Sequence, residues 1–114
     1  MLDTSILEKI RAMETEQSPN IVVRLIQMFQ EDSPRTIHAI HEAVANTDPE
    51  SARRALHTLK SSSANLGAHT LSELSTKMEQ MARDNDMDKL AETLIDLRCE
   101  YERVLQALEE EKGQ

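Results

Sequence analysis

Apolar residues recur every three or four positions along almost the whole chain, and very few residues interrupt this helical spacing. The sequence of 114 residues contains only two glycines and three prolines. Strong helix formers such as Leu, Ala, Glu and Lys are abundant, whereas aromatic residues make up 2% of the chain. Because β-strands favour β-branched and aromatic residues, this composition favours helices throughout. The sequence therefore predicts an all-α protein.

The few helix-breaking residues divide the chain into amphipathic segments. The predicted helices cover residues 4–15, 20–46, 49–66, 69–84 and 87–110. In the fourth of them, the predicted core-facing residues are Leu71, Leu74, Met78 and Met81. The connections are only a few residues long, so that consecutive long helices must run antiparallel. We therefore expect one domain over residues 1–114, an up-down-up-down antiparallel four-helix bundle with a short additional N-terminal helix.

Pro34 leaves the course of the second helix open. A proline inside a helix removes a hydrogen-bond donor and crowds the carbonyl of the preceding turn. The apolar stripe of residues 20–46 nevertheless keeps its direction across Pro34, which favours a single bent helix. The alternative is two helices, in which Ser33 is the N-cap and Pro34 takes the first helical position.

Charge and cysteine content exclude several classes of protein. The chain carries 13 Lys and Arg against 21 Asp and Glu, a formal net charge of −8, which disfavours a nucleic-acid partner. Cys99 is the only cysteine, so an intramolecular disulfide and a thiolate-rich metal site are excluded. No segment resembles a signal peptide, and no apolar run approaches the roughly 20 residues of a membrane span. We expect a cytoplasmic monomer without membrane insertion.

The most informative segment is residues 52–67, which read ARRALHTLKSSSANLG. At about 100° per residue, one side of this helix faces the core. The core-facing residues are Ala52, Leu56, Leu59, Ser63 and Leu66. His57 lies about 150° from the centre of this stripe, so its imidazole is predicted to point into solvent.

The neighbours of His57 are unusual for an exposed helix face. Arg53 lies one turn before it and Lys60 one turn after it, so two cations flank the ring. Ser61 and Ala64 follow on the same side, where exposed helices usually carry long charged side chains. Small residues leave the imidazole accessible to a partner protein, and both cations are predicted to stabilise a phosphoryl group there. Phosphoryl transfer depends mainly on such positioning and charge stabilisation.

Residues 57–68, HTLKSSSANLGA, resemble the signature of histidine phosphotransfer (HPt) domains of multistep phosphorelays. The family pattern is His-x-Leu-Lys-Gly, followed after about four residues by a hydrophobic residue and a glycine. The likeness extends to residues 25–39 and 71–81, which resemble the helices before and after the signature. The resemblance implies a four-helix bundle with the reactive histidine exposed midway along one helix.

The resemblance also implies a role for each matching position. His57 would be the phosphorylated residue, and Lys60 would assist the phosphoryl group. Ser61 departs from the family, which usually has glycine at this position. Ala64 matches a small position and Gly67 matches the glycine that closes the helix. We expect Ser61, Ala64 and Gly67 to provide steric clearance and docking for a partner.

The partners and cofactors follow from the same resemblance. The phosphoryl group would come from an aspartate of a receiver (response regulator) domain and pass to another receiver, and a hybrid sensor kinase is a further candidate partner. The Mg²⁺ for this exchange would belong to the receiver, so no cofactor and no metal ligand is expected on this chain. The sequence has no glycine-rich loop and no kinase motif, which predicts a phosphoryl carrier rather than an enzyme with its own ATP site.

Two other interpretations were weighed against this one. The small-residue face around His57 could serve a non-catalytic helical adaptor that docks a signalling partner. The three-residue spacing of His38 and His41 would suit zinc, but the sequence offers no evident third ligand. The phosphorelay carrier is the preferred hypothesis.

Overall fold

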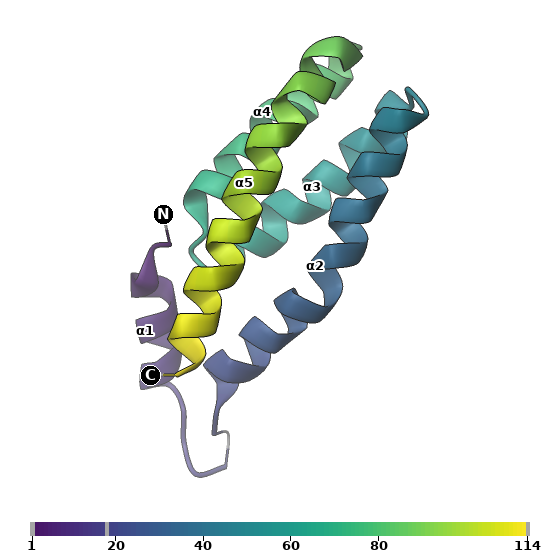
Figure 1. The fold of residues 1–114 in the computed structure, drawn as a ribbon. Coiled ribbons are helices and arrows are strands. Elements are labelled where there is room, and N and C mark those ends of the chain that lie inside the picture. Colours follow the sequence, from purple (N-terminus) through teal and green to yellow (C-terminus); the bar gives the residue numbers. More distant parts are fainter. Residues whose placement is uncertain (1, 18, 114) are drawn as a thin grey trace.

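Residues 2–17 and 19–113 are described in the computed structural model, and their regular structure consists of five helices. In chain order these are α1 (Thr4–Ala12), α2 (Ile21–Ala45), α3 (Pro49–Asn65), α4 (His69–Arg83) and α5 (Met87–Lys112). Helices α2 to α5 run alternately up and down in an antiparallel bundle, and α1 lies beside one end of it (Figure 1). The predicted all-α fold with a short additional N-terminal helix is confirmed. None of the helices in these residues has the length and apolar character needed to cross a membrane.

The helix ends follow from local capping. Helix α3 begins as its sequence indicates, because the Asp48 side chain accepts a hydrogen bond from the Ser51 N–H and Pro49 occupies the first turn. Helix α1 ends at Ala12 rather than at residue 15. Beyond that end, the Glu14 carboxylate accepts a hydrogen bond from the Val22 N–H in the first turn of α2. Glu14 thus satisfies a backbone donor that the start of a helix leaves unpaired.

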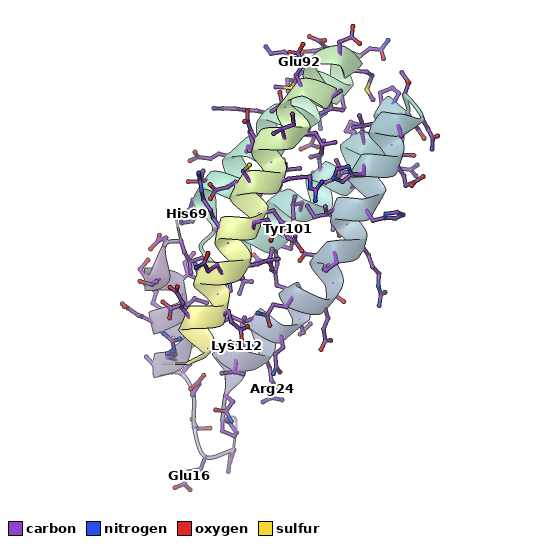
Figure 2. All side chains as sticks on the ribbon, viewed as in Figure 1. Glu16, Arg24, His69, Glu92, Tyr101 and Lys112 are labelled. Atoms are coloured by element: carbon purple, nitrogen blue, oxygen red, sulfur yellow. The ribbon has the colours of Figure 1, made fainter. Side chains whose placement is uncertain are left out.

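Helix α2 runs unbroken through Pro34, and its axis changes direction along its length (Figure 1). Pro34 is exposed, so the ring that interrupts the hydrogen bonding faces solvent. Ser33 does not cap a second helix. It is buried, and its hydroxyl lies 2.7 Å from the Tyr101 hydroxyl of α5, which projects into the bundle (Figure 2).

The hydrophobic core runs along the bundle axis and receives side chains from every helix. Its fully buried large residues include Leu7, Ile26, Ile40, Leu56, Leu59, Leu71, Met78, Leu90, Leu97 and Leu108. Burial of each such side chain stabilises the fold by about 1.5–3 kcal/mol. Two of them, Leu56 and Leu59, lie on either side of His57 in the sequence and fix the rotation of α3 about its axis.

The core-facing side of α4 differs from its predicted stripe. Leu71 and Met78 are fully buried as predicted, but Leu74 and Met81 are only partly buried against the core. The remaining buried positions of α4 are Ser75, Glu79 and Ala82. Helix α4 is therefore rotated so that Ser75, Glu79 and Ala82 face inward beside Leu71 and Met78, in place of Leu74 and Met81.

The N-terminal segment closes the end of α3. The Asp3 N–H donates a hydrogen bond to the Gly67 carbonyl at 2.7 Å, and a Cβ on Gly67 would lie 2.1 Å from the Asp3 carbonyl oxygen. Gly67 also has φ +80°, a left-handed conformation that favours glycine. At the start of α4, His69 lies beside this segment, with Nε2 2.9 Å from an Asp3 carboxylate oxygen (Figure 2). Gly67 itself is buried, so it exposes little surface of its own, and its expected role in steric clearance and docking stays a prediction.

Candidate functional site

His57 lies in the middle of α3 with its imidazole at the surface. Its side chain is 59% exposed, while Leu56 beside it is fully buried. Consecutive residues of a helix point about 100° apart, so the inward packing of Leu56 turns His57 away from the core. A partner protein can therefore reach the ring from solvent.

A buried carboxylate on α4 forms a hydrogen bond with the imidazole ring of His57. Glu79 has a side-chain exposure of only 4%, and its Oε2 lies 3.2 Å from His57 Nδ1. The other oxygen, Oε1, accepts a hydrogen bond from Lys60 Nζ at 3.1 Å. A third donor, Arg83 NH2, lies 3.3 Å from Oε2. Glu79 thus connects the histidine, the lysine one turn later on α3 and an arginine on its own helix.

The protonation of Glu79 follows from this set of partners. Burial by itself would raise the pKa of Glu79, but the hydrogen bonds from Lys60 and His57 and the charges of both groups outweigh burial and lower the pKa. The group is therefore an ionised carboxylate at neutral pH, and a carboxylate only accepts hydrogen bonds. The proton between the two side chains belongs to His57 Nδ1, which leaves the lone pair of the neutral ring on Nε2.

Sequence analysis did not find Glu79. The signal was present, because Glu79 follows the core residue Met78 and lies one turn after Ser75, on the side of α4 that packs against α3. A charged residue at a core-facing position is rare unless it is paired. Two of its three partners, His57 and Lys60, lie on α3 and are 22 and 19 residues away in the sequence, so hydrophobic spacing within α4 alone could not identify them.

The two predicted cations differ in where the structure places them. Lys60 is 30% exposed and lies against Glu79, next to the imidazole. Arg53 instead pairs with Glu50, one turn before it on α3, through Nε and NH2. Within the described residues Arg53 is hydrogen-bonded to Glu50, while the charge of Glu79 also contributes to raising the pKa of Arg53. Because the ion pair with Glu50 is exposed, it is weak and can open.

The two small residues that follow Lys60 on the same side leave space above the ring. Ser61 is exposed and Ala64 is half-buried. Neither side chain reaches far enough to cover an imidazole one or two turns away. The side of α3 that faces α2 borders a groove of about 280 Å³. Its lining includes Leu25, Met28, Phe29, Thr58, Ser62 and Leu66.

This groove begins at Thr58, directly beside His57, and has an apolar rim. Met28 of α2 is 57% exposed at its edge. Large exposed apolar side chains beside a reactive group are typical of surfaces that bind another protein. Helix α3 thus carries both the histidine and one side of the groove, whose lining residue Thr58 is next to His57 in the sequence.

Other candidate groups do not form a second site. No cluster of three or more His, Cys, Asp and Glu side chains in residues 2–17 and 19–113 could hold a metal ion. His38 lies 3.7 Å from Glu42, and burial together with the charge of Arg98 lowers the pKa of His41. Cys99 is exposed on α5.

Comparisons with known proteins agree with this geometry. The sequence model of the family described as "Hpt domain" matches residues 24–111. No curated protein sequence matches significantly. Among solved structures, the crystal structure of histidine-containing phosphotransfer protein B (HptB) from Pseudomonas aeruginosa PAO1 matches with a TM-score of 0.87 and 23% sequence identity. The match covers 98% of this chain and 94% of that chain, and it shows that the two share a fold.

Proposed function

The chain belongs to the Hpt domain family, whose model matches residues 24–111 of the 114, and we propose that it carries a phosphoryl group on His57 between the aspartates of two receiver domains. The resemblance read from residues 57–68 is thereby confirmed. One observation carries the proposal: the imidazole is exposed to a partner while a buried carboxylate holds its Nδ1.

The course of phosphoryl transfer depends on which ring nitrogen of His57 carries the lone pair. The Nε2 lone pair of His57 attacks the phosphorus of an aspartyl phosphate on the receiver. The N–P bond forms, the P–O bond to the receiver aspartate breaks, and that aspartate leaves as a carboxylate. The proton stays on Nδ1, so the phosphorylated ring carries a positive charge that faces the Glu79 carboxylate. Transfer to the second receiver is the same step in reverse.

The cations and the metal have separate roles in this proposal. Lys60, next to the ring, favours the negative charge that arrives with the phosphoryl group. Arg53 can contribute only after it releases Glu50, so its share is smaller than that of Lys60. The Mg²⁺ needed for the exchange is expected on the receiver domain. The chain acts as a carrier and depends on a kinase elsewhere for its phosphate.

Receiver domains are the proposed partners, and the groove between α2 and α3 supports this. A receiver must bring its aspartate close to Nε2 and exclude water while transfer takes place. The apolar rim at Met28 and Phe29 offers buried contact area beside the reacting atoms. Docking and chemistry would then use neighbouring parts of one surface.

The test is phosphotransfer from a radiolabelled receiver to the wild-type domain and to His57→Gln. Label on the wild type alone, labile in acid and stable in alkali, is expected. Addition of a second, unlabelled receiver should then remove the label from the domain and transfer it to that receiver. Equal labelling of the wild type and His57→Gln would overturn the assignment of His57.

A non-catalytic adaptor is the second candidate function, and the exposed Met28 at the groove is the observation that favours it. An adaptor would bind its partner equally well with His57→Gln and would take no label from any receiver. A carrier takes label, and its variant Met28→Ala should slow the transfer by weakening receiver binding.

A further inference from the structure

Three consecutive serines follow Lys60 on α3, and they differ in burial and in hydrogen bonding. Ser62 and Ser63 both donate their hydroxyl hydrogen to the Leu59 carbonyl one turn earlier. Ser63 is also fully buried. Ser61 is exposed, and within the part of the chain that the structure describes its hydroxyl has no hydrogen-bond partner. Ser61 is therefore the serine of this run whose donor is available to a ligand.

The position of Ser61 places that donor beside the imidazole. Residues four apart on a helix are neighbours, with Cβ atoms about 5–6 Å apart. The Cα–Cβ bonds of a helix tilt towards its N-terminus, so the Ser61 side chain leans over the turn that carries His57. Both residues are exposed, and the space between them is open to solvent.

Several polar groups around His57 already have partners. Lys60 Nζ and His57 Nδ1 both bind Glu79, and Arg53 binds Glu50. A phosphoryl group on Nε2 brings three oxygens that require donors. A serine hydroxyl can donate to a charged oxygen, and such a bond is about twice as strong as one between neutral groups.

We propose that the Ser61 hydroxyl donates a hydrogen bond to the phosphoryl group on His57 and stabilises the phosphorylated state of this domain. The inference rests on the proposed function and deepens it. Ser61 stands where the resemblance leads one to expect glycine, which has no side-chain donor. Compared with glycine, the serine therefore leaves less space above the ring but holds the phosphoryl group more strongly. No covalent chemistry at the serine is involved.

The experiment measures how the phosphoryl group distributes between a receiver and the domain at equilibrium. Ser61→Ala should shift this equilibrium constant towards the receiver by about three- to tenfold, because one hydrogen bond to a charged group is lost. Ser62→Ala is the matched control, since its hydroxyl is already bonded to the backbone. Ser61→Thr keeps the hydroxyl and should retain the wild-type constant even if its methyl group slows docking.

The phosphorus resonance of the phosphohistidine, followed by ³¹P NMR, gives a second readout. The chemical shift of this resonance should change in Ser61→Ala and stay unchanged in Ser62→Ala. A purely structural role of Ser61 would not produce this difference. An equilibrium constant for Ser61→Ala within twofold of wild type, with normal labelling of both proteins, overturns this inference and leaves the proposed function standing. Absence of label on the wild type overturns the proposed function itself.

Discussion

The Nδ1 atom of His57 lies 3.2 Å from Oε2 of Glu79, so the exposed imidazole of α3 is held by a carboxylate of α4 that is itself buried. Burial makes the carboxylate a fixed point, because the side chain has little freedom to move. The ring thereby has one defined orientation and one defined protonated nitrogen. Exposure of the imidazole and burial of the group that orients it are two parts of the same arrangement.

Glu79→Gln should slow phosphotransfer by about tenfold, which corresponds to the loss of a charged hydrogen bond. The amide oxygen can still accept from Nδ1, but the negative charge that faces the phosphorylated ring is gone. The measurement is the time course of label transfer from a receiver. Glu73→Gln is the control, because Glu73 is exposed on the same helix. Equal rates for Glu79→Gln and Glu73→Gln would contradict a positioning role for Glu79.

The contribution of Glu79 to stability should depend on pH. Its pKa is lowered on folding from the ordinary value of 4.5, so the native state binds fewer protons than the unfolded state near that pH. The stabilisation is therefore fully present above 4.5 and is lost as pH falls through the lower, native value. Urea unfolding of wild type and Glu79→Gln between about pH 6 and pH 3 should show their difference shrinking with acid. A difference that is constant over this range would argue against an ionised Glu79.

The exposed face of α3 could be predicted from the sequence, whereas the group that organises it could not. Leu56 and Leu59 belong to a continuous apolar stripe, so the direction of His57 follows from helical geometry alone. Glu79 is a charged residue at a core-facing position of α4, but two of its three donors, His57 and Lys60, come from α3, and no pattern within α4 identifies them. The predicted stripe placed Leu74 inward, while the structure leaves this side chain only partly buried.

Arg53 illustrates a second limit of sequence reasoning. Helical spacing places it one turn before His57, but the same spacing places it one turn after Glu50. Both contacts are compatible with the sequence, and the structure has the ion pair with Glu50. Competition between a neighbour three residues away and one four residues away is decided by side-chain geometry, which periodicity does not describe.

Gly67→Ala should destabilise the domain by roughly 2–3 kcal/mol. A left-handed φ is unfavourable for alanine, and the added Cβ would meet the Asp3 carbonyl oxygen at 2.1 Å, so that the N-terminal segment has to move. Urea unfolding measures the loss of stability, and faster hydrogen exchange of the Asp3 amide would place the change in the N-terminal segment. Gly113→Ala should have little effect, since the added Cβ would lie 3.4 Å from the Glu110 carbonyl oxygen, an ordinary contact distance. Similar stabilities of the two alanine variants would contradict this account.

Tyr101→Phe should reduce stability by about 1–2 kcal/mol, because the buried Ser33 hydroxyl loses the partner that now lies 2.7 Å away. Thermal unfolding gives the value. In the double variant with Ser33→Ala, both polar groups are removed together, so the total loss should be smaller than the sum of the single losses. Strict additivity would show that the two hydroxyls are not coupled. Phosphotransfer should be unchanged at a temperature where the variants are folded.

Lys60→Ala should slow phosphotransfer by about tenfold, and the comparison with Arg83→Ala separates its two roles. Both side chains bind Glu79, Lys60 through Oε1 and Arg83 through Oε2. Each removal leaves the buried carboxylate with two donors, so modest and similar losses of stability are expected from urea unfolding. Only Lys60 lies on α3, one turn from His57, where it can also meet phosphoryl oxygens. If Arg83→Ala slows transfer as much as Lys60→Ala, the lysine acts solely by holding Glu79. If only Lys60→Ala slows transfer, the lysine must contact the phosphoryl group directly.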